Sequence, residues 1–260
     1  MLTSLQIGQN GRLGNQMFQY AALSSVAFTR GYEWGLQRNE SVDLWRVFKM
    51  DGVEEINQSD ANQLKYIYHE PDYFFNASVF LVNDFTDIRG HFQSATYFGN
   101  CFEMVKKTYT FKDEINFKSM FEIQKYNDGR PLCSIHVRRG DYLQKKDYHP
   151  PCTLDYYQKA KNEIIRAANG NVKFLVFGDD HQWIKDNLLD DNSVLVEGNS
   201  PEVDLCLMTK CAAHIISNSS FAWWGATLGN FRTVIAPKMW FGPQGPKRWD
   251  SVYINSWGLI

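Results

Sequence analysis

The segment LCSIHVRRGDY occupies residues 132–142. Its first part, Leu132 to Ile135, is an apolar run that follows the turn-rich segment KYNDGRP at 125–131, and this pattern is typical of a buried strand. The strand ends in an imidazole, two guanidinium groups and a carboxylate, from His136, Arg138, Arg139 and Asp141. Fixed positive charge at the end of a core strand indicates a site that holds an anion.

Strands and helices alternate on the C-terminal side of this segment. Apolar runs predict strands at 132–137, 172–178, 194–197, 214–217 and 233–237. A helix is predicted from the N-cap residue Thr153 to about Ala168, a short helix begins near His181, and Pro201 opens a further one. This alternation predicts a parallel sheet that is covered by helices on both faces. In such sheets, ligands bind at the carboxyl ends of the strands.

The N-terminal region predicts another unit of strand, loop and helix. Residues 2–7 are expected to form a short strand, and a glycine-containing turn follows over Gly8–Gly14. Apolar residues then recur at helical spacing over Asn15–Arg30. The stretch 39–128 is expected to hold helices and loops, with a strand near 79–82.

The length and charge limit the classes of protein that this chain can represent. Its 260 residues suit one large or two small domains, and the break at 125–131 predicts a boundary between residues 1–128 and 129–260. A general nucleic-acid binder would carry a basic excess, so the formal net charge of −2 disfavours that class. Aromatic residues make up 15% of the chain, which fits a ring-rich core or a sugar-binding cleft.

Cysteine usage and hydropathy indicate where the protein works. The five cysteines are odd in number and form no Cys-x-x-Cys, so neither a disulfide framework nor a zinc knuckle is expected. The N-terminal residues lack the features of a signal peptide, and no window approaches the roughly 20 apolar residues of a membrane span. We therefore expect a cytoplasmic protein, at most peripheral to a membrane.

Polar side chains gather at three predicted strand ends. Arg138 or Arg139 could grip a diphosphate with a bidentate fork, and one of Asp179–Asp180 could accept hydrogen bonds from guanine. Ser219–Ser220 precede a predicted helix whose N-terminus offers backbone N–H groups to a phosphate. Each feature alone has a plainer explanation as a turn, an N-cap or a surface salt bridge. Together they predict a nucleotide-diphosphate pocket.

Four segments resemble, in order, the motifs of the α-1,2-fucosyltransferases, glycosyltransferase family 11. They are GRLGNQMFQYA (11–21), GHFQSATYF (90–98), HVRRGDY (136–142) and SNSSFAWWGA (217–226). FGDDHQWIK (177–185) and HPPCTLDYYQKA (149–160) fit the same family, so the resemblance spans nearly the whole chain. His91 departs from the family pattern, which more often has an aromatic residue such as tyrosine there, and this departure concerns the acceptor side.

The resemblance implies an α/β fold of the GT-B-like class, with two Rossmann-like halves facing across a cleft. Residues 1–128 would form the acceptor-side half and residues 129–260 the half that binds GDP-fucose. The implied reaction moves L-fucose from GDP-β-L-fucose to the 2-hydroxyl of a terminal β-galactoside with inversion, in bacterial surface polysaccharide synthesis. The partners would be GDP-fucose and a galactose-terminated glycan. A non-catalytic glycan-binding protein and a transferase that uses another GDP-sugar stay open as alternatives.

The resemblance also implies roles for particular residues. The donor-binding residues would be His136, Arg138, Asp180, Ser219, Ser220, Phe221, Gly14 and Gln16. The acceptor-binding residues would be His91, Gln93 and Tyr97. The catalytic candidates are Arg138, Asn15 and Asp141.

These catalytic candidates have different expected tasks. Arg138 would stabilise the leaving diphosphate, and Asn15 would reach the donor phosphate or the acceptor. Asp141 is either a general base or the partner that orients Arg138 or Arg139. No Asp-x-Asp occurs, so neither a metal nor another cofactor is expected, although the adjacent Asp179–Asp180 leaves a metal site open.

Overall fold

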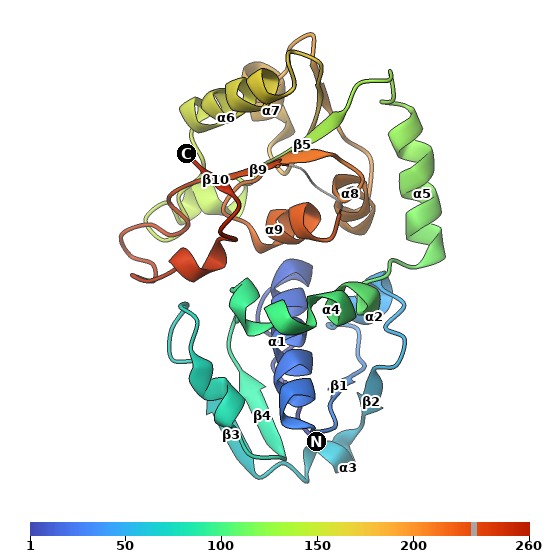
Figure 1. Cartoon of the computed structure of the whole chain (residues 1–260), viewed down its shortest axis with the longest axis vertical. Coiled ribbons are helices and arrows are strands. Elements are labelled where there is room, and N and C mark those ends of the chain that lie inside the picture. The colour runs from blue at the N-terminus through green and yellow to red at the C-terminus, as the bar shows by residue number, and fades with distance from the viewer. Residues whose placement is uncertain (230–232) are drawn as a thin grey trace. The chain divides into compact units, whose positions relative to one another are not determined.

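The computed structural model describes residues 1–229 and 233–260 (Figure 1). Contacts divide the chain into two compact units, Met1–Lys112 with Arg248–Ile254, and Asp113–Lys247 with Asn255–Ile260. Helix α5 (Asp113–Gln124) packs on α8 (Pro201–Met208), and therefore the division lies before α5 rather than at the turn that follows it. The assignment of one half to the donor and the other to the acceptor stays a prediction.

A six-stranded parallel sheet forms the centre of the second unit. Its strands are β5 (Leu132–Val137), β6 (Lys173–Gly178), β7 (Ser193–Leu195), β8 (Ala213–Ile215), β9 (Thr233–Ala236) and β10 (Gly258–Leu259). The strand order is β10-β9-β8-β5-β6-β7, so the chain builds outward from β5 on one side and then returns to pair β8 on its other side. This is the doubly wound arrangement, and the predicted parallel sheet is confirmed.

Helices connect these strands as the sequence predicts. They are α6 (Leu154–Ala167), α7 (His181–Asn187), α8 and α9 (Ser220–Thr227), and a short 3₁₀ helix, η4 (Asp141–Gln144), follows β5. The side chain of Thr153 accepts a hydrogen bond from the Tyr156 amide at 3.2 Å, which confirms it as the N-cap of α6. Pro201 stands in the first turn of α8, where its missing N–H costs no hydrogen bond.

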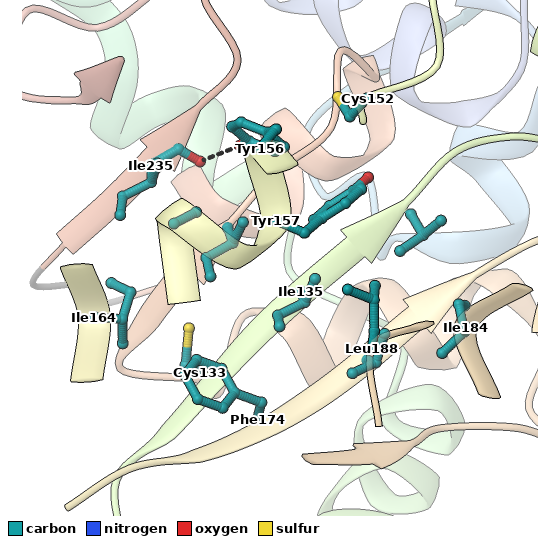
Figure 2. Packing of buried hydrophobic residues seen from close by; sticks show 14 of the residues in the cluster. Cys133, Ile135, Cys152, Tyr156, Tyr157, Ile164, Phe174, Ile184, Leu188 and Ile235 are labelled. Atoms are coloured by element: carbon teal, nitrogen blue, oxygen red, sulfur yellow. Dashed lines mark hydrogen bonds between the residues drawn. The ribbon is translucent and has the colours of Figure 1, made fainter. Parts of the chain in front are cut away.

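The apolar face of α6 packs on the sheet, as Figure 2 shows for Ile164 above Cys133 and for Tyr157 beside Ile135. The buried tyrosines of this helix have hydrogen-bonded hydroxyl groups. Tyr156 donates to the carbonyl oxygens of Ile216 and Ile235 at 2.6 and 3.1 Å. Tyr157 donates to the carbonyl oxygen of His136 at 3.1 Å. The core thus fixes the backbone where β5, β8 and β9 end.

The first unit is also built on parallel strands. They are β1 (Gly35–Gln37), β2 (Glu54–Ile56), β3 (Tyr66–His69) and β4 (Thr86–Arg89), with β1 paired to β2 and β3 paired to β4. Parallel bridges join Leu2 to Trp34 and Thr3 to Asp87. The strand predicted at 2–7 is therefore limited to Leu2 and Thr3, because the chain turns from Leu5 onward. These two residues connect the strand pairs in the order β2-β1-Leu2/Thr3-β4-β3.

Helix α1 (Leu13–Arg30) follows the glycine-containing turn, and Gly31 ends it with φ +68°, as the left-handed C-cap of a helix requires. The shorter elements are α2 (Asp43–Val47), α3 (Gln58–Ala61), α4 (Phe102–Thr108), and the 3₁₀ helices η1 (Ala77–Leu81), η2 (Ala95–Tyr97), η3 (Gly99–Cys101) and η5 (Asp250–Val252). No helix in the described part of the chain has the length and apolar character needed to cross a membrane.

The strand predicted near 79–82 is wrong, because residues 77–81 form η1. The side-chain oxygen of Asn76 accepts a hydrogen bond from the Ser78 amide at 2.9 Å. This local contact closes a turn at the start of the apolar run and favours helical over extended backbone. The apolar run itself carried no information about this cap.

Candidate functional site

The strand order of the second unit places the candidate site. Ligands of doubly wound sheets bind at the carboxyl ends of the strands, where the strand order reverses. In this sheet the reversal lies between β5 and β8. The predicted residues that cluster at these two strand ends are His136, Arg138 and Asp141 from β5 onward, and Ser219, Ser220 and Phe221 after β8.

His136 is buried at the end of β5. Its Nδ1 lies 2.8 Å from Ser217 Oγ, and its ring centroid lies 5.7 Å from that of Phe221. Burial lowers the pKa of His136 from 6.5 to about 4. The imidazole is therefore neutral near pH 7, and it provides hydrogen-bonding atoms rather than fixed charge.

Arg138 is the cation of this site, and its side chain is 20% exposed. One terminal nitrogen lies 2.8 Å from Asp179 Oδ2, and the other forms an ion pair with Asp141 Oδ1. The guanidinium carbon also lies 5.4 Å from the ring centroid of Tyr142. These contacts hold the guanidinium in one place while they leave part of it accessible to a ligand.

Arg139 has a separate set of partners, as the alternation along an extended chain predicts. Its Nε lies 3.0 Å from Asp180 Oδ2, and its guanidinium carbon lies 4.4 Å from the ring centroid of Trp183. Asp180 Oδ1 accepts a hydrogen bond from the Trp183 amide at 3.1 Å and so caps α7. Both oxygens of Asp180 thus have partners within the protein, and the guanine contact predicted for Asp180 would have to share or displace one of them.

Asp179 is a site residue to which the sequence assigned no specific role. Its Oδ1 accepts hydrogen bonds from the amides of Arg139 and Gly140 at 2.8 and 3.1 Å, while its Oδ2 pairs with Arg138. A Cβ at Gly140 would lie 2.8 Å from Asp179 Oδ2, so a side chain at this position would force the carboxylate to shift. The parallel pairing of Val137 with Gly178 is the signal that could have found Asp179, because it brings the next residues of both strands together.

Asn218, between β8 and α9, is another residue without a predicted role. Its side-chain amide donates to the carbonyl oxygens of Pro150 and Trp240 at 3.0 and 2.9 Å. Its own carbonyl oxygen accepts from the Tyr142 hydroxyl at 3.0 Å. Asn218 thus ties the loop before α9 to the loop after β5.

Ser219 occupies the N-cap position of α9, and its hydroxyl makes no capping hydrogen bond. Ser220 and Phe221 stand in the first turn of that helix. The helix runs from residue 220 to residue 227, so the sequence prediction of a serine-led helix start is confirmed. Its role in holding a phosphate stays a prediction.

In the first unit, a polar residue in the first turn of α1 contacts the segment 90–98. Gly14, Asn15 and Gln16 lie in the first turns of α1, which begins at Leu13 and so includes the helix predicted from Asn15 onward. Asn15 Oδ1 accepts a hydrogen bond from Gln93 Nε2 at 3.1 Å. Gln16 is buried and donates to the carbonyl oxygen of Ser41 at 3.0 Å. The predicted acceptor residue Gln93 therefore lies beside the predicted catalytic residue Asn15.

Glu70, which the sequence did not single out, holds the segment that carries His91 and Tyr97. Its Oε2 accepts from the amides of His91 and Phe92 at 2.7 and 2.8 Å, and its Oε1 accepts from the Tyr97 hydroxyl at 2.9 Å. Tyr97 is 1% exposed, and the His91 ring stacks on Tyr73 with centroids 4.7 Å apart. The Tyr97 hydroxyl is thus engaged inside the protein, where it shapes this segment.

The acidic residues of the site are paired with cations. Asp179 contacts Arg138, and Asp180 contacts Arg139. Among residues 1–229 and 233–260, no group of three or more His, Cys, Asp or Glu side chains is arranged to hold a metal ion. Whether the reaction proceeds without a metal stays a prediction.

The model of glycosyl transferase family 11 matches residues 2–260. This chain belongs to glycosyl transferase family 11. The match confirms the resemblance indicated by the motifs from residue 11 to residue 226 and assigns the chain to a family of transferases.

Two named transferases are similar in sequence to this family 11 chain. An alpha-1,2-colitosyltransferase of Escherichia coli is 29% identical over 273 residues, which cover 89% of this chain and 90% of that protein. The galactoside alpha-(1,2)-fucosyltransferase 1 of Alouatta caraya is 25% identical over 238 residues, which cover 86% of this chain and 65% of that protein.

Solved structures show the fold of the family 11 chain. The NodZ alpha-1,6-fucosyltransferase soaked with GDP-fucose has a TM-score of 0.56 at 17% identity, with 95% of this chain and 96% of that chain covered. POFUT1 in complex with GDP-fucose has a TM-score of 0.51 at 10% identity, with 90% of this chain and 97% of that chain covered. The predicted α/β, GT-B-like fold class is confirmed, whereas the facing of two halves across a cleft stays a prediction.

Proposed function

We propose that this chain transfers L-fucose from GDP-β-L-fucose to the 2-hydroxyl of a terminal β-galactoside, with inversion at the fucose C1. The observation that carries this proposal is Arg138, a partly exposed guanidinium at the reversal of strand order in a chain of glycosyl transferase family 11. The relatives named as α-1,2-transferases support the linkage, and the solved structures with GDP-fucose support the donor.

The departure of GDP is the step for which the geometry offers a cation. When the bond between C1 and the phosphate oxygen breaks, its electron pair stays on the diphosphate, and Arg138 would offset the new charge with a bidentate fork. Asp141 and Asp179 hold the guanidinium in place in the absence of a donor. A bound diphosphate would take over part of the guanidinium that these carboxylates now contact.

The sugar passes to the acceptor in the same displacement. The acceptor oxygen bonds to C1 from the face opposite to GDP, positive charge develops on the sugar ring, and the hydroxyl proton leaves to a base or to water. Asp141 could take this proton, but its ion pair with Arg138 supports a role in orienting that cation. His136, Ser219, Ser220 and Phe221 would surround the nucleotide and its phosphates.

The first unit would hold the acceptor in this proposal. Asn15 and Gln93 form a hydrogen-bonded pair of amides, a pattern that can bind sugar hydroxyl groups as donor and as acceptor. The ring of His91, which stacks on Tyr73, would contact the sugar beside these amides. Tyr97 would not contact the sugar and would instead hold the segment 91–97 in place through its hydrogen bond to Glu70. The reaction would need no metal, because Arg138 supplies the positive charge that a metal provides in other transferases.

We place the reaction in the assembly of a bacterial surface polysaccharide. A further relative, the O-antigen biosynthesis glycosyltransferase WbnK of Escherichia coli, is 29% identical over 179 residues, which cover 64% of this chain and 58% of that protein. The role of that relative in O-antigen biosynthesis supports the placement. A site on the cytoplasmic face of the membrane would follow from the nucleotide-sugar donor.

A second candidate differs only in the donor. The first relative named above transfers colitose, a sugar that equals fucose without its 3-hydroxyl group. An enzyme for GDP-colitose would use the same Arg138 chemistry with a pocket that does not hydrogen-bond that hydroxyl. A pocket that hydrogen-bonds the 3-hydroxyl rejects the sugar that lacks it by about 10⁴-fold or more. A pocket without such a bond rejects the sugar that carries the hydroxyl far less strongly.

The test is release of GDP from GDP-fucose and from GDP-colitose, with lactose as the acceptor and linkage analysis of the product. Fucose in α-1,2 linkage to galactose supports the main proposal, and a preference for GDP-colitose supports the second candidate. A thermal melt with GDP distinguishes both from a glycan-binding protein without catalysis. At a GDP concentration about a hundredfold above a micromolar Kd, binding should add about 2.7 kcal/mol to the free energy of unfolding. An unchanged melting temperature at that concentration would rule out the nucleotide site.

A further inference from the structure

The first unit has a pocket of about 520 Å³ that is separate from the residues discussed above. Its lining residues are Leu5, Gln6, Gln9, Asn10, His69 and Arg89. This volume falls within the range of roughly 300–1,000 Å³ that is typical of small-ligand sites. It is larger than a single bound water or ion needs and suits a sugar ring.

The position of the pocket follows from the strand order of this unit. His69 is the last residue of β3, Arg89 is the last residue of β4, and Leu5 comes shortly after the Leu2–Thr3 strand. From Leu2–Thr3 the chain first adds β1 and β2 on one side, and then adds β3 and β4 on the other. The pocket therefore lies at the carboxyl ends of parallel strands where the order reverses, which is the general ligand position in open α/β sheets.

The walls of the pocket are held by hydrogen bonds. Asp87 is buried, and its carboxylate accepts from the Leu5 amide at 2.9 Å and from Arg89 Nε at 2.7 Å. The Gly90 carbonyl oxygen accepts from the side-chain amides of Gln6 and Gln19. A binding site whose lining is ordered before the ligand arrives loses less entropy on binding.

The lining chemistry suits a neutral ligand with many hydroxyl groups. The Nε of Arg89 is paired with Asp87. The two terminal nitrogens of this guanidinium have no hydrogen-bonded or ionic partner among the described residues, so they are available to a ligand. Gln9 donates through its amide nitrogen to the Leu5 carbonyl oxygen at 3.1 Å, so its amide oxygen can accept from a hydroxyl. Asp87 offsets the charge of Arg89, and this disfavours a strongly anionic ligand.

We propose that this pocket binds a neutral pyranose unit of the acceptor glycan, with Arg89 and Gln9 as its main polar contacts. The inference rests on the proposed function for the identity of the glycan. It adds a subsite outside the segment 91–97, to which the pocket is joined through the hydrogen bonds on Gly90. Arg89 and Gln9 would then determine acceptor affinity without taking part in the departure of GDP.

The experiment compares Arg89→Met and Gln9→Ala with matched controls from the same unit. Arg38→Met removes an arginine that is 58% exposed and pairs with Glu55, and Gln58→Ala removes an exposed glutamine on α3. Both pocket variants should raise the KM for lactose about tenfold, the effect of losing one good hydrogen bond to a charged or polar partner. The affinity for GDP and the slow release of GDP to water should stay at the wild-type values. Gln9→Ala should also keep the wild-type melting temperature, whereas Arg89→Met should lower it, because it leaves the buried Asp87 carboxylate without its cation.

Two kinetic outcomes overturn the pocket proposal. One is a KM for lactose that is unchanged in Arg89→Met and Gln9→Ala, and the other is a KM that rises equally in the two control variants. Calorimetric titration of the full chain with lactose and with methyl β-D-galactopyranoside gives a readout that does not depend on turnover. Binding that Arg89→Met weakens supports the pocket even if GDP-fucose is not the donor, whereas no binding of either sugar to the wild type overturns it.

Discussion

The Arg138 guanidinium lies 2.8 Å from an oxygen of Asp179, and the other oxygen of that carboxylate accepts the backbone amides of Arg139 and Gly140. One carboxylate at the end of β6 therefore orients both the cation and the loop that carries it. The cation is placed before any ligand arrives, so little reorganisation is needed when negative charge develops. This relationship makes the arginine loop a preorganised site rather than a flexible turn.

Replacement of Arg138 should be the most damaging single change to catalysis. Arg138→Ala should lower kcat/KM by about 10²- to 10³-fold, which corresponds to roughly 3–4 kcal/mol of transition-state stabilisation. Arg138→Lys should restore only part of this loss, because an ammonium group lacks the planar fork. Steady-state release of GDP provides the measurement.

The matched control for Arg138 is Arg166→Ala. Arg166 lies on α6 with 73% of its side chain exposed, and its partner is Glu163 on the same helix. Its removal should leave kcat/KM within about twofold of wild type, as expected for an exposed ion pair. Near-normal turnover of both Arg138 variants would exclude Arg138 as the residue that stabilises the leaving group.

Asp179→Asn separates the two tasks of Asp179. The amide oxygen can still accept from the amides of Arg139 and Gly140, but the neutral side chain no longer pairs with Arg138. We expect kcat to fall about tenfold while the melting temperature changes by less than about 3 °C. Asp179→Ala should lower both, since it also leaves two backbone amides without an acceptor.

Steady-state kinetics and a thermal melt measure the kcat and the melting temperature of the two Asp179 variants. If Asp179→Asn has the wild-type kcat, Asp179 serves the loop alone and does not position the cation. If both variants melt at the wild-type temperature, the two backbone hydrogen bonds contribute nothing to stability.

Glu70 should make the stability of the first unit fall as the pH rises. Burial raises the pKa of Glu70 from 4.5 to about 7, since the loss of hydration outweighs the hydrogen bonds from Phe92, Tyr97 and His91. The folded protein therefore keeps a proton that the unfolded chain has already released. The stability from this group is fully present below pH 4.5 and is lost as the pH rises through about 7.

Urea unfolding of wild type and Glu70→Gln tests this dependence. Between about pH 5 and about pH 8, wild type should lose roughly 2–3 kcal/mol of unfolding free energy relative to the variant, as a shift of this size requires. Glu103→Gln, on the surface helix α4, serves as the control. The absence of a pH-dependent difference over this range would show that the buried carboxylate is already ionised in the folded protein.

His136 should act in the opposite direction at the other site. Its pKa is lowered from 6.5 to about 4 chiefly by burial, so the folded protein resists a proton that the unfolded chain accepts. The stability from this group is present above pH 6.5 and is lost as the pH falls through about 4. His136→Gln should remove about 2 kcal/mol of this dependence between about pH 8 and about pH 5.

An NMR titration gives a direct check on His136. The ring resonances should stay those of a neutral imidazole down to about pH 5. Titration of His136 near neutral pH would contradict its burial.

The sequence by itself determined the parallel sheet of the second unit and the kind of site at its edge. Apolar runs separated by helical patterns specify β5 to β9, because strand and helix periods are local properties of the chain. Arg138 and Arg139 are adjacent at the end of an extended segment, where successive side chains point to opposite sides, and they contact Asp179 and Asp180 respectively. The ordered motifs were enough to predict the family.

The tertiary structure alone decided which residues support those side chains. Asp179 meets the arginine loop because β5 and β6 pair in parallel register, and Glu70 meets the amides of His91 and Phe92 because β3 and β4 end side by side. The pocket at Arg89 likewise depends on contacts that no sequence period encodes. Propensity acts over a few neighbouring residues, whereas these partners are brought together by strand pairing across long stretches of chain.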